Sequence, residues 1–292
     1  MKKKNVLNAV TGYGFMLPSF VLLLLFVLIP IVVAFYWSTL KYNGMNPGTF
    51  VGLNNFKEIF KDPNFIRALK NTLRFMLTSV PLQTSCSLGV AALLAHNLRN
   101  RFGEFIRGAL FIPVLCSAAL IGGIMQYIFA ADDGSLANVL LNFLGVDKVN
   151  WLGNAKVAPW VVIGISVWKS LGYFVVIFYA AIMDIPVNLF EAAEIDGANK
   201  WQQFWHITLP NIKSVLFMVI TVGTIWSFQF FDLAYVMTAG GPSFSNVSIV
   251  YLIYNKAFKD FRLGYACAIG VLLFFLMLIV NLIQRLLMKE DD

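Results

Sequence analysis

The 292-residue sequence contains few charged residues, few cysteines and few histidines. Only 13% of its residues are Asp, Glu, Lys or Arg, whereas a soluble domain has about 25%. A chain with so little charge cannot cover a globular surface with polar groups. This shortage excludes an ordinary soluble enzyme, and it also excludes a disordered tail protein, which would be rich in charge.

The cysteines and histidines are not arranged for a disulfide framework or a metal centre. Cys86, Cys116 and Cys267 all lie inside apolar runs, with none of the spacings that disulfide-rich modules or zinc sites use. His96 and His206 are far apart, and no cluster of carboxylates or cysteines stands beside either of them. We therefore expect no metal, no cofactor and no catalytic residues in this chain.

Apolar residues are abundant instead, at 59% of the chain, with a mean hydropathy of +0.74. They gather in six long runs at about 15–37, 72–95, 109–130, 159–183, 214–237 and 265–287. At about 1.5 Å per residue, each run can cross a hydrocarbon core of about 30 Å as a helix. Because lipid cannot satisfy backbone polar groups, helices are required. The sequence predicts an all-α integral membrane protein with six transmembrane helices in a single domain covering residues 1–292.

The net charge of +7 comes from basic residues placed between the apolar runs rather than on one patch, so it does not indicate nucleic acid. Lysines and arginines divide almost evenly between the two sides of the membrane. Short loops carry more weight, however. Residues 2–4 are all lysine, and Arg99, Arg101 and Arg107 crowd the brief link between the second and third runs. We therefore expect both termini in the cytoplasm.

The links on the outer side contain short amphipathic segments. Residues 56–60 and 65–69 have the pattern of helical turns separated by Asp62 and Pro63, a helix boundary signal. Residues 135–144 also have apolar side chains at helical spacing. We expect these segments to lie along the membrane surface.

The longest inner link, at about 184–213, predicts two short helices that meet at a glycine. Glu191, Ala192 and Ala193 favour a helix, and Gly197 is a stop signal. A second short helix follows, with Trp201, Phe204, Trp205 and Thr208 on one side. By amphipathicity alone the simpler interpretation is a loop that rests on lipid headgroups. The alternative is an elbow that serves a partner protein.

The spacing in this link favours the second interpretation. Glu191-Ala192-Ala193, three residues, Gly197, nine residues, Ile207, one residue and Leu209-Pro210 resembles the EAA signature. That signature marks the membrane subunits of binding-protein-dependent ATP-binding-cassette importers. The wider pattern, together with residues 50–56 and 231–242, is similar to the carbohydrate-uptake branch, which includes the maltose transporter. The resemblance extends from the first run to the sixth.

The resemblance implies a type I importer permease fold and a set of partners. The elbow would dock in a cleft of a cytoplasmic ATPase dimer, with Glu191 paired to a basic residue there and Gly197 permitting the turn. The implied coupling residues are Glu191, Ala192, Ala193, Asp196, Gly197, Trp201, Phe204, Ile207, Leu209 and Pro210. A second homologous permease and an extracytoplasmic sugar-binding protein would complete the importer. The chain has no G-x-x-x-x-G-K-[ST] loop, so we expect ATP hydrolysis in a separate subunit and no enzymatic activity here.

A polar stripe in the fourth run is a candidate transport path. Lys169 is an ionisable group at membrane depth, which is costly and indicates function. Ser166, Ser170 and Tyr173 share its helical face, and Tyr173 and Trp168 could stack on a sugar ring. The alternative remains open that the serines join neighbouring helices while Lys169 extends toward the membrane surface.

The resemblance implies that the transport path involves two helices, the one before and the one after the EAA loop. Maltose-type permeases hold sugar at mid-membrane on the helices before and after the EAA loop. The matching positions here are Ser166, Trp168, Lys169, Ser170, Tyr173, Trp226, Ser227 and Phe230, with Val114 and Ala118 corresponding more loosely. Where the relative has amide side chains, this chain has serines and a lysine. A different sugar is therefore expected, and an anionic one remains open.

Asp232 is the second ionisable group at membrane depth. It could pair with Lys169, or it could cap the turn before Gly240. By the predicted spans the two groups differ in depth by about 7 Å at 1.5 Å per residue, which counts against a direct pair.

The leading hypothesis is one permease of a carbohydrate importer, multi-pass in a bacterial cytoplasmic membrane. The same architecture could import a polyol phosphate or another anionic solute, an alternative that Lys169 keeps open. An ion-coupled secondary transporter would need a relay of acidic or histidine residues in the spans, for which Asp232 is the one candidate. A membrane scaffold would leave the polar stripe unexplained.

Overall fold

The computed structural model describes residues 2–97 and 100–287, and within these ranges it is mostly helical. The chain divides into two compact units. The first comprises the residues up to Asp62 together with Ile253–Phe275, and the second comprises Pro63–Leu252 and the residues from Leu276 onward. The fold is described for each unit in turn.

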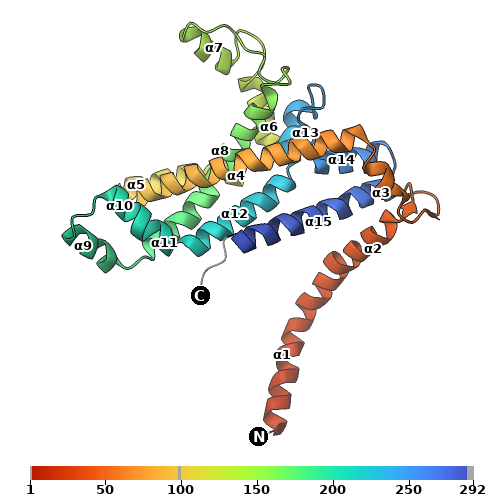
Figure 1. The fold of residues 1–292 in the computed structure, drawn as a ribbon, viewed down its shortest axis with the longest axis horizontal. Helices are drawn as coiled ribbons and strands as arrows, with labels where there is room; N and C mark the ends of the chain where they lie inside the picture. The colour runs from red at the N-terminus through yellow and green to blue at the C-terminus, as the bar shows by residue number, and fades with distance from the viewer. Residues whose placement is uncertain (1, 98–99, 288–292) are drawn as a thin grey trace. The chain divides into compact units, whose positions relative to one another are not determined.

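The first unit begins with a long apolar helix and contains a small hairpin (Figure 1). Its elements are α1 (Lys2–Leu23), η1 (Leu24–Leu28), α2 (Ile29–Ser38), β1 (Leu40–Lys41), β2 (Thr49–Phe50), α3 (Asn54–Ile59), η3 (Asn255–Lys259) and the first part of α15 (Leu263–Leu287). The strands β1 and β2 pair antiparallel, with Leu40 opposite Phe50. The helix α14 (Ile249–Tyr254) runs across the boundary between the units.

The hairpin of the first unit is tied to its helices by backbone contacts. Gly264, at the start of α15, lies so close to the Leu40 carbonyl oxygen that a Cβ atom there would overlap it. The Asn55 amide donates hydrogen bonds to the carbonyl oxygens of Ser38 (2.8 Å) and Leu40 (2.9 Å). These contacts fix the hairpin against α3 and α15 within this unit.

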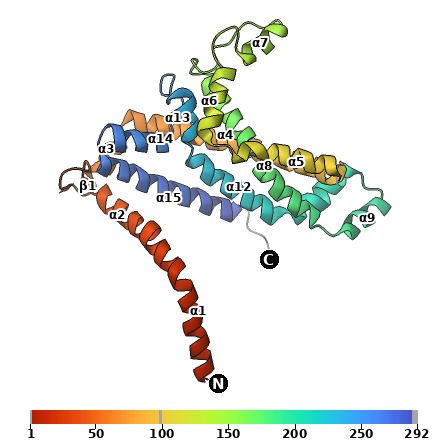
Figure 2. The same cartoon turned by 180° about the vertical axis from the view of Figure 1, so that it is seen from behind.

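The second unit is a bundle built around α8 (Figure 2). Its elements are α4 (Pro63–Asn97), α5 (Arg101–Leu115), α6 (Ala118–Ile128), α7 (Leu136–Phe143), α8 (Ala158–Met183), α9 (Val187–Ile195), α10 (Lys200–Gln203), η2 (Phe204–Thr208), α11 (Leu209–Asn211), α12 (Lys213–Phe228), α13 (Asp232–Thr238) and the end of α15. Helices α4 and α5 pack along α8, α4 also packs on α12, and α6 packs on α13. Phe174, Val175 and Phe178 are fully buried in the centre of this bundle.

The lengths of four helices match the thickness of a membrane. The segments are Tyr13–Ser38, Pro63–His96, Ala158–Met183 and Leu263–Leu287. They agree with the predicted runs 15–37, 72–95, 159–183 and 265–287, although the second starts earlier. Residues 65–69 belong to the first turns of α4 and do not form a separate surface helix. Pro63 begins α4 because the first position of a helix needs no N–H donor.

The predicted runs 109–130 and 214–237 are not single straight helices, which corrects the prediction. Within the first of these runs, α5 and α6 are bent by 98°, and a separate bend of 73° lies just before the second run, between the segment Lys200–Asn211 and α12. Cys116 is extended between α5 and α6, and the Ser117 side chain accepts a hydrogen bond from the Leu120 N–H, which starts a new helix. The run 214–237 ends as a helix at Phe228, and α13 starts afresh at Asp232. Each bent pair can count as one span, which gives four to six spans.

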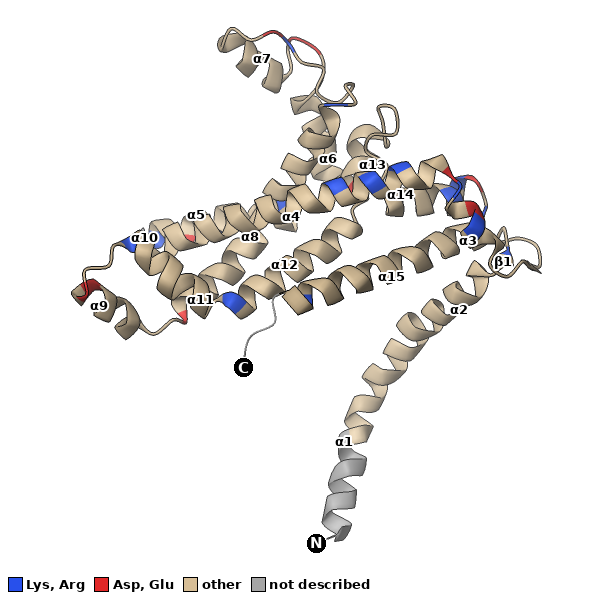
Figure 3. Ribbon diagram, viewed as in Figure 1, with Lys and Arg blue, Asp and Glu red and all other residues tan. Residues whose placement is uncertain are grey.

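Charged residues are sparse in the middle of the helices, where Lys169 of α8 is an exception. Figure 3 shows that they gather toward helix ends and links, while long stretches of α12 and α15 carry none. The helices predicted at 56–60 and 135–144 are present as α3 and α7. The fold is therefore a helical membrane protein with one short hairpin.

Candidate functional site

The link between α8 and α12 forms an elbow, which we define as residues 187–211. Helix α9 ends at Ile195, and Gly197 follows its C-cap with a φ of +79°, in the left-handed region that favours glycine. The Gly197 N–H donates to the Glu194 carbonyl (3.1 Å), and the Ala198 N–H donates to the Ala193 carbonyl (2.9 Å). This pair of bonds is a Schellman C-cap. The helix stop that the sequence predicts at Gly197 is confirmed.

The next helix is capped almost immediately. The Asn199 side chain accepts a hydrogen bond from the Gln202 N–H (2.9 Å), and the Gln202 side chain accepts one from the Asn199 N–H (2.8 Å). This reciprocal capping box satisfies donors at the helix start. The buried Gln203 amide also donates to the Ala198 carbonyl. Only Gly197 and Ala198 separate the two capped ends, so the angle of the elbow is fixed by hydrogen bonds on both sides.

One side of the elbow is packed on the bundle. Phe190, Phe204 and Ile207 pack against the buried cluster that contains Phe178, and Phe190 meets His96 of α4 edge-on at 5.8 Å. The π-type turn η2 precedes Pro210, and in it the Leu209 N–H donates to the Phe204 carbonyl. Because Pro210 has no N–H to donate, the helix makes this local adjustment.

The other side of the elbow is exposed and partly apolar. Glu191, Ala192, Asp196 and Pro210 are exposed. Ile195 is 87% exposed and Trp201 is 69% exposed. A hollow of about 300 Å³ lies in the crook of the elbow, between residues 193–198 and 202–207. The predicted coupling residues thus divide into an anchored set, which includes Phe204 and Ile207, and an exposed set, which includes Glu191 and Trp201.

The candidate transport path brings two aromatic residues together. The Tyr173 ring of α8 lies 5.1 Å from the Trp226 ring of α12, and Phe174 lies 5.3 Å from Trp226. Tyr173 is half-buried and Trp226 remains exposed. The two helices that flank the elbow in sequence therefore meet at an aromatic cluster with one open face.

The serines of the path make bonds between helices. The Ser170 hydroxyl donates to the Gln83 side chain of α4 (3.0 Å) and also lies near the Ser166 carbonyl. Ser227 is buried and shares a hydrogen bond with Ser79 of α4 (3.0 Å). In this structure these contacts match the interpretation in which serines join helices.

Helix α4 supplies residues that the sequence reasoning missed. The Phe230 ring stacks on Phe75 of α4 at 3.8 Å. Thr72, Ser79, Gln83 and Ser87 are all buried on α4, with spacings of seven, four and four residues. Polar residues repeated on one helical face within an apolar run indicate a buried stripe, and this signal was available in the sequence.

The N-terminal half of α4 also holds the loop before α14. The Asn71 amide donates to the carbonyl oxygens of Phe244 (2.9 Å) and Val247 (3.0 Å), and Arg74 donates to the Ser245 carbonyl (2.8 Å). A charged side chain in a membrane span is costly. Arg74 offsets part of that cost because a backbone carbonyl of the loop accepts its hydrogen bond.

The two ionisable groups of the path are not paired. Within the part of the chain that the structure describes, no ion pair joins Lys169 to Asp232. Asp232 is exposed in the first turn of α13, where the helix dipole favours a carboxylate. Lys169 is half-buried, and its neighbour Trp168 lines an apolar cavity of about 340 Å³ at the bend between α5 and α6. Val114 and Ala118 lie on either side of that bend.

Comparisons of the sequence identify a family and several relatives. Residues 87–290 match the model of the "Binding-protein-dependent transport system inner membrane component" family. The chain is 35% identical to the probable ABC transporter permease protein YurN of Bacillus subtilis, over 97% of each chain. It is 33% identical to the arabinooligosaccharides transport system permease protein AraP of Halalkalibacterium halodurans, over 91% of this chain and 85% of that one. It is 30% identical to the multiple sugar-binding transport system permease protein MsmF of Streptococcus mutans, over 100% of both.

A comparison of folds finds a similar transporter chain. The structure matches a chain of a bacterial alginate ABC transporter, solved in complex with an alginate pentasaccharide-bound periplasmic protein. The TM-score is 0.87 at 22% identity, with 98% of this chain and 96% of that chain covered. At this identity the likeness shows that the two chains share a fold.

Proposed function

Since this chain belongs to the family of inner membrane components of binding-protein-dependent transport systems, we propose that it is a permease subunit of an ATP-driven oligosaccharide importer. In this proposal the two units together form one permease domain, covering residues 1–292, and provide half of the translocation path. The observation that carries the proposal is the elbow. It has a fixed angle, an exposed carboxylate at Glu191 and exposed apolar side chains at Ile195 and Trp201.

The elbow is suited to couple an ATPase to the path. Its exposed side would dock on a separate cytoplasmic ATPase dimer, with Glu191 paired to a basic residue there. Its anchored side reaches the bundle through Phe190 and Phe204, and its second helix leads through the 73° bend into α12. Movement of the elbow would therefore shift α8 and α12, which carry Tyr173 and Trp226. ATP would favour one conformation through contacts that differ between the two states.

The remaining partners follow from the same proposal. An extracytoplasmic sugar-binding protein would deliver the solute, and a second homologous permease would supply the other half of the path. The segment Tyr13–Ser38 is apolar, and its most apolar window has no buried residue, so a lipid or protein surface must cover it. We place both termini in the cytoplasm of a bacterial cell, which puts the elbow on the inner side and the hairpin on the outer side.

The choice of oligosaccharides rests on the relatives and on the composition of the path. Relatives at 33% and 30% identity are described as transporting arabinooligosaccharides and as a multiple sugar-binding system. Tyr173 and Trp226 offer aromatic faces, and Ser166 and Lys169 share the Tyr173 face of α8 by helical spacing. Among the residues that the structure describes, no three His, Cys, Asp or Glu side chains form a group, and Asp232 is exposed at the start of α13, so the ion-coupled alternative gains no support.

The proposal is tested by two separate variants of α9, one that replaces the carboxylate of Glu191 and one that replaces the nearby carboxylate of Glu194. In proteoliposomes that contain all proposed subunits, Glu191→Gln should lower ATP-driven sugar uptake by about tenfold or more, because loss of one partner of a docked charge pair costs about 2–5 kcal/mol. Glu194→Gln is the matched control, since Glu194 is also exposed on α9 and bonds Gly197 through its backbone carbonyl alone. It should leave uptake near the wild-type rate. Equal losses in both variants would contradict the docking role, and sugar transport by the chain alone without ATP would overturn the proposed function.

The aromatic cluster gives a second prediction. Trp226→Ala should raise the KM for uptake by about tenfold, because it removes one of two aromatic faces worth about 1.4 kcal/mol to a bound sugar. ATP hydrolysis without sugar should change little. Trp160→Ala is the control, since Trp160 is exposed on α8 near its start. A KM that changes equally in both variants would remove Trp226 from the path.

A further inference from the structure

One cavity in the first unit has no part in the elbow or the aromatic cluster. It has a volume of about 550 Å³, which lies within the usual range for small-molecule sites. The hairpin loop, one face of α3 and the turn that leads into α15 form its walls. All of these elements belong to the same unit, so the cavity is complete without the second unit.

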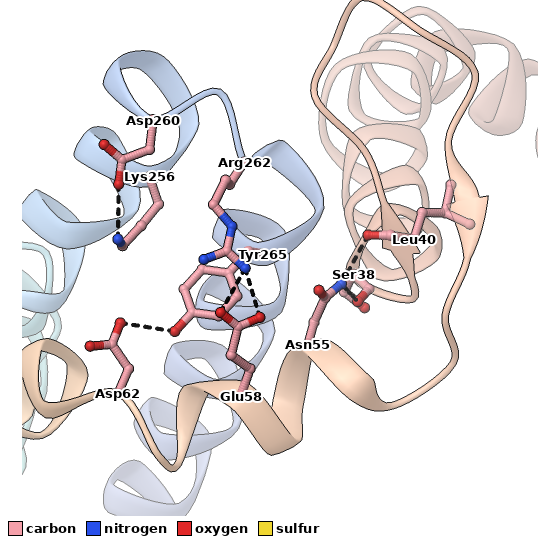
Figure 4. A network of polar contacts seen from close by, with 9 residues as sticks. All are labelled: Ser38, Leu40, Asn55, Glu58, Asp62, Lys256, Asp260, Arg262 and Tyr265. Atoms are coloured by element: carbon pink, nitrogen blue, oxygen red, sulfur yellow. Dashed lines mark hydrogen bonds and ion pairs between the residues drawn. The ribbon is translucent and has the colours of Figure 1, made fainter.

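The rim of the cavity is held in place by hydrogen bonds. Asn55 of α3 is buried. Its amide donates hydrogen bonds to the carbonyls of Ser38, at the end of α2, and Leu40, at the start of β1 (Figure 4). In the hairpin loop the Asn43 side chain accepts hydrogen bonds from the N–H groups of Met45 (3.1 Å) and Asn46 (3.0 Å). The polar groups of the rim are therefore placed before any ligand arrives, which lowers the entropy cost of binding.

One wall carries a charge pair that is already neutralised. Arg262 donates to both carboxylate oxygens of Glu58, at 2.8 and 2.7 Å, and its guanidinium lies 4.3 Å from the centre of the Tyr265 ring. Tyr265 in turn donates to Asp62 (3.0 Å), and Figure 4 shows the pair and the tyrosine side by side. The hydrogen bonds that Arg262 donates to Glu58 raise the pKa of Arg262. The side chains of Arg262 and Glu58 remain 41% and 51% exposed, so the pair can still bond a ligand.

The rest of the lining suits a ligand rich in hydroxyl groups. Asn46 and Asn54 offer amides, each with donors and an acceptor, and Thr49 offers a hydroxyl. A sugar hydroxyl also donates and accepts, so these groups complement it. Tyr42 and Phe261 add aromatic faces for the apolar faces of sugar rings.

The lining carries a formal charge of only +1, since Glu58 and Arg262 compensate each other and Lys41 alone has no opposite charge among the lining residues. Phe261 has a φ of +51°, a strained conformation for a bulky residue, and its side chain is exposed. Strain of this kind is concentrated at functional sites.

We propose that this cavity binds a short neutral saccharide on the extracytoplasmic side of the membrane. The hairpin follows the first span along the chain, so the proposed cytoplasmic N-terminus puts it on the extracytoplasmic side. The cavity would hold solute that the binding protein releases. This inference rests on the proposed function for its choice of sugars, and it adds a saccharide site outside the aromatic cluster of Tyr173 and Trp226.

The test uses the complete importer in lipid nanodiscs, without the binding protein. Arabinotriose and maltotriose are the neutral probes, an alginate trisaccharide is the acidic probe, and binding is titrated by saturation-transfer NMR. In a background of Trp226→Ala, which weakens the aromatic cluster, the double variant Thr49→Ala and Asn54→Ala should weaken binding of a neutral probe at least tenfold. Lys57→Ala is the control, since Lys57 is exposed on α3 outside the lining, and it should leave binding unchanged.

Each contrary outcome overturns the inference. Equal binding in the double variant and the control would remove the saccharide from this cavity, as would the absence of binding of every neutral probe. Binding of the alginate trisaccharide alone would assign an anion site. If the double variant lost docking of the binding protein while saccharide binding stayed the same, the cavity would be a protein contact. Failure of the wild-type importer to take up any sugar with ATP would instead count against the proposed function, and this separate assay distinguishes the two failures.

Discussion

Replacement of Gly197 by proline is expected to abolish sugar uptake, while the chain still inserts in the membrane and the binding protein still captures solute. Gly197 has a φ of +79°, whereas proline is locked near −65°. Proline would also remove the N–H that donates to the Glu194 carbonyl and completes the C-cap of α9. Both losses fall on the joint between the two capped helices, so the elbow would present its exposed side at a different angle.

Gly197→Asn is the matched control for this prediction. A Cβ atom at this position would meet no atom within 4 Å, so the effect of a substitution comes from the backbone alone. Asparagine adopts the left-handed region more readily than other non-glycine residues. Uptake in proteoliposomes should therefore fall by at least a hundredfold for proline and by less than about tenfold for asparagine, a difference of at least about 1.4 kcal/mol. Wild-type uptake in the proline variant would refute the elbow as the coupling element.

The features of the fold that depend on local sequence were predictable. The run 159–183 corresponds to α8 (Ala158–Met183), and the run 265–287 corresponds to α15 (Leu263–Leu287). Length and hydropathy determine such helices because the backbone of a membrane span must bond within itself. The elbow was predictable for a similar reason, since helix formers and a terminal glycine act within a few residues.

The bend between α5 and α6 was not predicted because hydropathy does not report the direction of a helix axis. Residues 109–130 are apolar on both sides of the break at Cys116 and Ser117, so the run has the composition of one span. Ser117 is a good N-cap, and Pro113 lies shortly before it. Those local signals for a second helix start were present, but the length of the apolar run outweighed them.

The partners of the path residues were missed because they are remote in the sequence. Ser170 bonds Gln83, which is 87 residues away, and Ser227 bonds Ser79, which is 148 residues away. The spacing of polar residues in the sequence indicated a polar face on α8. That spacing does not reveal which other helix packs against this face. The cavity of the first unit depends in the same way on Glu58 meeting Arg262 from distant parts of the chain.

Replacement of Gly172 by alanine is expected to destabilise the bundle strongly. Gly172 lies in the middle of α8, where it faces α5. A Cβ atom there would overlap the Leu110 carbonyl group and lie 2.9 Å from the Phe111 Cα. These are backbone atoms of a packed helix and cannot rotate aside as a side chain can. The two helices must separate, at a cost of about 3 kcal/mol, the upper end of the usual range for overpacking.

Gly164→Ala, in the same helix, should stabilise the protein slightly instead of destabilising it. A Cβ atom at Gly164 would meet no atom within 4 Å, and the position is exposed. Alanine favours a helix over glycine by about 0.5–1 kcal/mol, so this variant should melt slightly above the wild type in detergent, whereas Gly172→Ala should melt well below it. The two variants make the same chemical change in one helix, so the difference between their melting temperatures isolates the contact with α5. Similar melting temperatures would show that α5 does not approach α8 at Gly172, and the packing that positions Tyr173 beside Trp226 would have to be revised.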